Sequence, residues 1–234
     1  MCIFPPLARL ALAAIFAAYT LLLPGQALAK EYGQYDLKLL LGASPPPGKG
    51  GTFNVAYLDR VLQDLGQHAA NYPPQFDSAR DQQRAQRDVG FLMGMLDAGF
   101  GAAAPPEVLL RMGVLGVYGH NLQVPNAAAY AQARFTMLLE HNPEHAAGNY
   151  QFGQFLAASG RSKEAMPYLM RAKDKGVVPA SYTLGMVYLG LGDKPRAIEM
   201  LTAYQRAEPT NGSVGKLIQA IREGKMEVKR VGGK

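Results

Sequence analysis

The sequence of 234 residues contains a single cysteine, Cys2, and no tryptophan. Cys2 lies in a segment that we expect to be removed, so the mature protein would contain no thiol. That excludes disulfide bonds, thiolate metal sites and cysteine nucleophiles together, and leaves packing to stabilise the fold. Charged residues make up only 18% of the chain, whereas hydrophobic residues make up 48%. This balance argues against a disordered chain and favours a packed core.

Histidine is also scarce, and no H-E-x-x-H or G-x-S-x-G motif is present. His141 and His145 are four residues apart, which on one helix would suit a metal ion. Pro143 lies between them, so we predict that one helix ends there and that the two rings belong to different elements. We interpret Tyr118 and His120 as residues of a surface loop. The four histidines are His68, His120, His141 and His145.

Residues 41–52, LGASPPPGKGGT, superficially resemble a phosphate-binding loop. Gly42 is one residue too far from Gly48, and Gly50 stands where a hydroxyl should hold magnesium. Three prolines also remove N–H donors. We therefore predict a Pro/Gly linker here, and no catalytic residue, metal site or cofactor in the chain. An enzyme with its site in residues 52–104 remains the third-ranked alternative.

The first 29 residues have the layout of a secretory signal peptide. Arg9 is the sole charge, an apolar run spans residues 10–23, and Ala27-Leu28-Ala29 forms an A-x-A cleavage site. We predict cleavage after Ala29 and a periplasmic or secreted protein with no membrane span thereafter. An uncleaved anchor is the alternative. The formal charge of +6 is spread without aromatic interleaving, which argues against nucleic-acid binding.

The rest of the chain is predicted to be helical. Residues 30–51 form an N-terminal segment and linker, residues 52–104 form N-terminal helices, and residues 224–234 form a basic tail. Val55, Leu58, Val61, Leu62 and Leu65 share one face of a helix that ends before the prolines at 73 and 74. A longer helix over residues 76–100 is polar in its first half. We expect that half to face solvent, with its aspartates and arginines paired within the helix.

A repeat follows in residues 105–223. Two stretches align with a constant separation of 32 residues, which is typical of stacked helix pairs. A glycine in the first helix of each pair allows close approach, and a second glycine ends that helix at positive φ. An alanine marks the helix crossing, and a leucine fills the core. The equivalent residues are Gly153 and Gly185, Gly160 and Gly192, Ala165 and Ala197, and Leu169 and Leu201.

Residues 146–209 resemble the tetratricopeptide repeat family, and the boundary between the two units resembles the related Sel1-like repeat. The second unit carries Leu184-Gly185-x-x-Tyr188, then Ala197 and Leu201, then Pro209. A degenerate earlier unit would use helices at 107–118 and 127–140, and a helix at 213–223 would cap the array. The resemblance implies an all-α fold, an α-solenoid of stacked antiparallel helix pairs in a right-handed superhelix.

The resemblance also implies a concave groove lined by the first helix of each pair, called helix A. The residues carried over are apolar, aromatic or amide, and none forms the basic clamp that some family members use. We therefore expect a secreted or periplasmic protein–protein interaction scaffold or adaptor, not an enzyme, that binds a protein or peptide for an envelope or secretion assembly. A cell-wall glycan-binding or glycan-processing helper is the alternative. The groove candidates are Tyr150, Gln151, Gln154, Tyr182, Thr183, Met186 and Leu189, with Ala147, Ala157 and Pro179 at equivalent positions.

Overall fold

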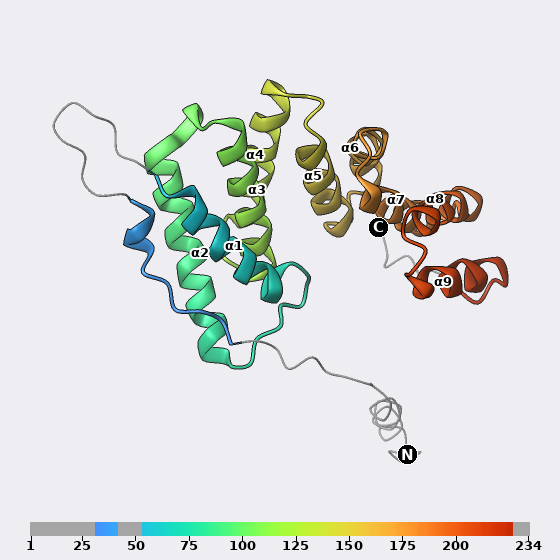
Figure 1. The fold of residues 1–234 in the computed structure, drawn as a ribbon, viewed down its shortest axis with the longest axis horizontal. Helices are drawn as coiled ribbons and strands as arrows, with labels where there is room; N and C mark the ends of the chain where they lie inside the picture. Colours follow the sequence, from blue (N-terminus) through green and yellow to red (C-terminus); the bar gives the residue numbers. More distant parts are fainter. Residues whose placement is uncertain (1–30, 42–52, 227–234) are drawn as a thin grey trace, which may run out of the picture.

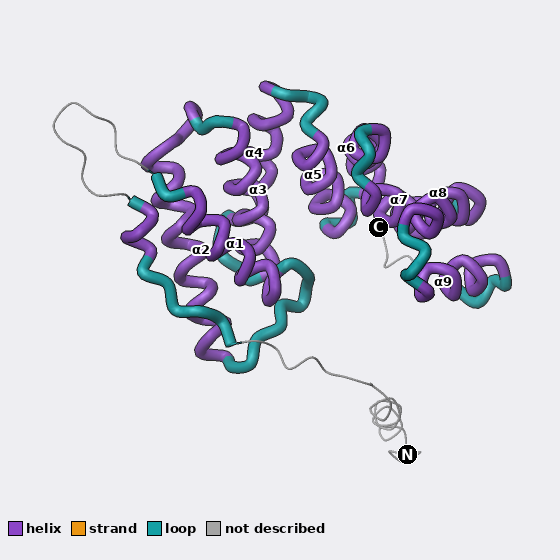
Figure 2. The backbone as a smooth tube through the Cα atoms, viewed as in Figure 1, coloured by secondary structure: helices purple, strands orange, loops and turns teal. Residues whose placement is uncertain are grey.

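The computed structural model describes residues 31–41 and 53–226. The predicted signal peptide, the Pro/Gly linker and most of the basic tail lie outside these residues. Within them the chain is helical and forms no named strand (Figure 2). None of the described helices is both long and apolar enough to cross a membrane. The α-helices are α1 Val55–Ala69, α2 Ala79–Phe100, α3 Pro106–Asn121, α4 Ala127–His141, α5 Ala146–Ala158, α6 Ser162–Asp174, α7 Val178–Gly190, α8 Lys194–Ala207 and α9 Gly212–Arg222.

The helices form an α-solenoid, in which successive antiparallel pairs stack along the length of the molecule (Figure 1). The pairs are α3 with α4, α5 with α6, and α7 with α8. Helix α6 packs on α7, and α9 packs on α8 at the far end. At the other end α1 and α2 each pack more against α3 than against each other. The predicted all-α solenoid is therefore confirmed.

Glycines at equivalent positions set the spacing within two of the pairs. A Cβ atom on Gly153 would lie 2.7 Å from Cγ of Leu169, and one on Gly185 would lie 2.7 Å from Cγ of Leu201. Both leucines are fully buried, so the glycines make room for core side chains. Gly160 and Gly192 follow the first helix of each pair with φ of 77° and 84°. Glycine reaches this left-handed region without a steric penalty, as the repeat alignment predicted.

The histidine pair lies at a junction between helices, as predicted. Helix α4 ends at His141, whose Nδ1 lies 2.8 Å from the carbonyl oxygen of Met137. His145 is the N-cap of α5 and accepts a hydrogen bond at Nδ1 from the backbone N–H of Gly148 at 3.0 Å. The described residues contain no cluster of His, Cys, Asp and Glu suited to a metal ion.

One expectation about the first helices is wrong, and another is correct for one helix face only. Tyr118 and His120 lie in the last turn of α3 and not on a loop. The polar half of α2 faces solvent on one side only, because Asp81 is 7% exposed and Ala85 is fully buried. Arg80, Gln83 and Arg87 are exposed on the other side. Arg84 does pair with Asp81 within the helix, at 2.6 Å. The sequence pattern could not reveal that another segment covers this half of α2.

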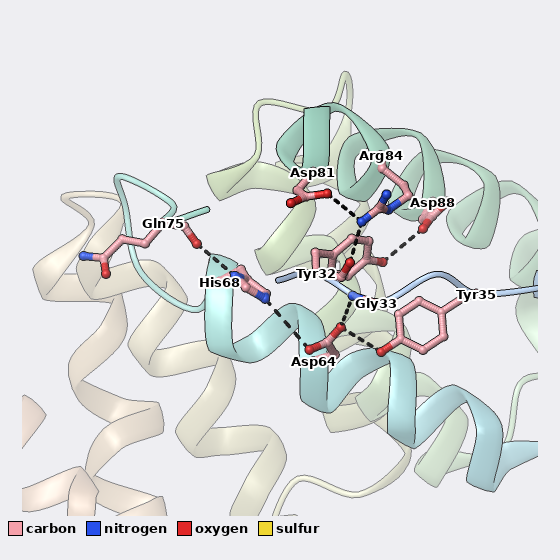
Figure 3. Close-up of polar contacts among 9 residues, drawn as sticks. All are labelled: Tyr32, Gly33, Tyr35, Asp64, His68, Gln75, Asp81, Arg84 and Asp88. Carbon is pink, nitrogen blue, oxygen red and sulfur yellow. Dashed lines mark hydrogen bonds and ion pairs between the residues drawn. The ribbon is translucent and has the colours of Figure 1, made fainter. Parts of the chain in front are cut away.

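That segment is the N-terminal strap, residues 31–41, which lies across α1 and α2 (Figures 1 and 3). The Tyr32 hydroxyl donates to Oδ2 of Asp88 on α2 at 3.1 Å, and Arg84 donates to the Tyr32 carbonyl. On α1, Oδ2 of Asp64 accepts from the backbone N–H of Gly33 at 2.8 Å and from the Tyr35 hydroxyl at 2.7 Å. The N-terminal strap therefore links two helices that pack little on each other.

An ion pair between α1 and α3 gives a pH-dependent prediction. Arg111 donates to both carboxylate oxygens of Asp59, at 2.6 and 2.9 Å, and this contact lowers the pKa of Asp59. The stabilisation is present above the unfolded pKa of about 3.9 and is lost as pH falls through the lower folded pKa. Asp59→Asn should therefore reduce the free energy of unfolding at neutral pH and have little effect at low pH. Urea unfolding curves recorded at several pH values measure this difference.

The matched control is Asp77→Asn, because Asp77 is exposed and has no hydrogen bond or ion pair within the described chain. It should leave the free energy of unfolding nearly unchanged at each pH. An Asp59→Asn effect that persists unchanged in acid would contradict the ion-pair explanation.

Candidate binding groove

A cavity of about 370 Å³ lies on the helix A side of the solenoid, between α5 and α7. Its walls are the exposed faces of these two helices, and Tyr204 of α8 contributes to one side. The lining contains tyrosines, small residues and uncharged polar groups. It consists of Tyr150, Gln154, Ala157, Ala158, Ser162, Pro179, Tyr182, Thr183, Met186, Val187 and Tyr204.

Five of the seven principal groove candidates line this cavity, namely Tyr150, Gln154, Tyr182, Thr183 and Met186. They come together because helix A of each pair presents residues three and four apart on one face. Ala157 and Pro179 line it as well. The helical register of the repeat is therefore enough to place most of this lining.

Two of the remaining candidates lie elsewhere and one is buried. Gln151 lines a neighbouring cavity, and Ala147 is exposed but lines neither. Leu189 is 3% exposed and belongs to the hydrophobic core, so its assignment to the groove is wrong. Leu189 lies in the last turn of α7, and its side chain is buried in the core. Burying a leucine side chain stabilises the fold by about 1.5–3 kcal/mol.

Tyr204 is a lining residue that the helix A register could not give, because it belongs to the second helix of its pair. Its ring centroid lies 5.3 Å from that of Tyr182 at an angle of 58°. The spacing within α8 nevertheless indicates that Tyr204 faces α7. Tyr204 follows Ala197 by seven residues, or two helical turns, and Ala197 is the residue that marks the contact with α7. Tyr204 therefore shares the face of α8 that meets α7.

Local contacts constrain two of the groove side chains, Tyr150 and Thr183. Burial raises the pKa of Tyr150, so its hydroxyl stays protonated at neutral pH. The Thr183 hydroxyl donates to the carbonyl of Pro179 at 3.3 Å. Tyr182 remains 37% exposed. An aromatic ring that stays accessible beside fixed polar groups is available to a ligand.

Two further cavities adjoin this one and share lining residues with it. One of about 620 Å³ shares Gln154 and Ala158 with the first, and one of about 220 Å³ shares Tyr182 and Tyr204 with it. None of the residues that line the three cavities is Asp, Glu, Lys or Arg. A ligand in this track would be held by apolar, aromatic and neutral hydrogen-bonding contacts.

A buried polar cluster lies apart from these cavities, beneath the N-terminal strap (Figure 3). His68 is 4% exposed and stacks on Phe76 with ring centroids 4.7 Å apart. Its Nδ1 lies 2.9 Å from the carbonyl of Gln75, and its Nε2 lies 3.8 Å from Asp64. The Asp64 carboxylate already accepts bonds from the strap, and neither residue lines a cavity described above. The cluster is therefore suited to fixing the strap.

Comparisons of the sequence with family models and with curated proteins, and of the structure with solved structures, returned no match. The resemblance to tetratricopeptide and Sel1-like repeats therefore stays a prediction from the residues quoted above.

Proposed function

We propose that this protein is a tetratricopeptide-type interaction scaffold, secreted or periplasmic, that binds a segment of a partner protein in the groove between α5 and α7. The observation that carries the proposal is the neutral cavity at the helix A positions, formed by Tyr150, Gln154, Tyr182 and Met186. A scaffold or adaptor for an envelope or secretion assembly fits a chain with a predicted export signal and no motif for catalysis.

The lining favours an uncharged partner segment with apolar side chains. Met186 is unbranched and polarisable, so it adapts to different side chains. The Tyr182 and Tyr204 rings offer large contact areas, and aromatic anchors dominate many interfaces. Gln154 provides both a donor and an acceptor for a main chain. Because the lining has no fixed charge, binding should depend little on salt.

The groove is tested by the double variant Tyr182→Ala with Met186→Ala. In-cell crosslinking with mass spectrometry first identifies the partner, and titration with the purified partner then gives its affinity. Loss of two anchors should weaken binding by at least about tenfold. Both side chains are partly exposed, so the variant should keep its helical circular dichroism.

Met170→Ala is the matched control, because Met170 is 46% exposed on α6 and lines none of the three cavities. It should leave the affinity unchanged. If the double variant binds the crosslinked partner as tightly as the unmodified protein, the groove is not the binding site.

A further inference from the structure

The cavity of about 620 Å³ is built differently from the groove. Its walls are the ends of α3 and α5 and the residues that follow α1, Ala70 to Tyr72. These last residues come from outside the repeats and close one side, so the cavity is more enclosed than an open helix A groove. Its volume lies within the range of about 300–1,000 Å³ that is typical of small-ligand sites.

Side-chain amides dominate the polar lining of this cavity. Two have partners in the protein. Asn121 donates to the carbonyl of Ala69 at 2.9 Å, and Gln123 makes a long contact of 3.5 Å with the Tyr72 hydroxyl. The other three have no hydrogen bond within the described chain and can bind a ligand. They are Asn71, Gln151 and Gln154.

Aromatic and apolar groups supply the rest of the surface. Phe155 is 5% exposed and lines the cavity together with Val117. The His120 ring meets Phe155 edge-on, with centroids 5.8 Å apart. At the rim the Tyr72 ring is 66% exposed.

We propose that this cavity binds a neutral saccharide unit. Each free amide provides two N–H donors and one carbonyl acceptor, which matches neighbouring sugar hydroxyls that each donate and accept. The exposed face of Tyr72 can cover the C–H face of a sugar ring. An uncharged polar ligand needs hydrogen bonds but no oppositely charged side chain. The lining of this cavity contains no Asp, Glu, Lys or Arg.

The same features fit an extended peptide less well. A peptide strand directs successive side chains to opposite faces and needs an open track of about 3.3 Å per residue. Here the track ends at the wall formed by residues 70–72. A charged sugar or nucleotide would lose hydration without gaining a counter-charge. The cavity therefore gives the glycan alternative a defined position, which meets the peptide groove only at Gln154 and Ala158.

Ligand-observed NMR titrations of the purified protein with neutral tetrasaccharides of glucose, of xylose and of N-acetylglucosamine test the proposal. At least one should bind saturably, and Tyr72→Ala and Gln151→Ala should each weaken that binding at least tenfold. Tyr72 is exposed and makes one long hydrogen bond, to Gln123, and the Gln151 side chain makes none, so melting temperatures should change little. The groove variant Tyr182→Ala with Met186→Ala should bind the saccharide as the unmodified protein does.

Absence of binding by all three saccharides would overturn the proposal. So would saccharide binding that neither cavity variant weakens, because the sugar would then lie elsewhere. If the protein partner bound to the groove instead lost affinity with Tyr72→Ala and no sugar bound, the cavity would belong to the peptide track. The two sets of variants therefore separate failure of the saccharide site from failure of the groove.

Discussion

Replacing Tyr32 with alanine should lower the free energy of unfolding by about 3–5 kcal/mol, the usual cost of truncating a buried aromatic residue. Tyr32 is 1% exposed and packs edge-on against His68 and Phe76. Burial and the adjacent Asp88 raise its pKa, so its hydroxyl remains a donor at neutral pH. The variant removes this core contact and the hydrogen bond to α2 together. Urea unfolding followed by circular dichroism measures the loss.

The damage should be local to one end of the solenoid. Stability in stacked repeats is roughly a sum of units and their neighbouring interfaces. Hydrogen exchange should therefore accelerate in α1 and α2, while α7 and α8 keep their protection. Equal acceleration in α7 and α8, or an unchanged unfolding curve, would show that the strap does not hold the first helices.

Tyr32→Phe is the matched control for the hydroxyl. It keeps the ring and leaves Asp88 without that donor, which should cost about 1 kcal/mol. If the phenylalanine variant is as unstable as the alanine variant, the hydrogen bond and not ring packing is the main contribution.

Replacing Gly116 with alanine should destabilise the protein by about 2 kcal/mol or more, in the range for overpacked cores. A Cβ atom on Gly116 of α3 would lie 2.7 Å from the backbone nitrogen and 2.8 Å from Cα of Ala131 on α4. Backbone atoms cannot move aside as a side chain can, so α3 and α4 must separate. The clash outweighs the gain of about 1 kcal/mol that alanine brings to a helix interior.

Gly94→Ala provides the control on α2, because a Cβ atom there would have no neighbour within 4 Å. This substitution should stabilise the protein by about 0.5–1 kcal/mol through helix propensity alone. Opposite signs for the two changes in the same urea assay support the packing explanation. A stabilising Gly116→Ala would contradict it.

The sequence by itself determined the helix pairs and their turns. Gly160 and Gly192 follow the helices that they were predicted to end, and Leu169 and Leu201 fill the core. These features depend on neighbours one or two turns away, so helical periodicity and internal repetition reveal them. The same register placed Tyr150, Gln154, Tyr182, Thr183 and Met186 around one cavity.

Only the tertiary structure decided where the N-terminal strap packs, that Leu189 is buried, and which residues line the amide-rich cavity. Tyr32 meets Asp88 across 56 residues, and the cavity joins residues that follow α1 to the ends of α3 and α5. A helical pattern shows which residues share a face, but the gain from burying that face depends on which distant element covers it. That choice is made when the whole chain packs, and it is therefore absent from any local stretch of sequence.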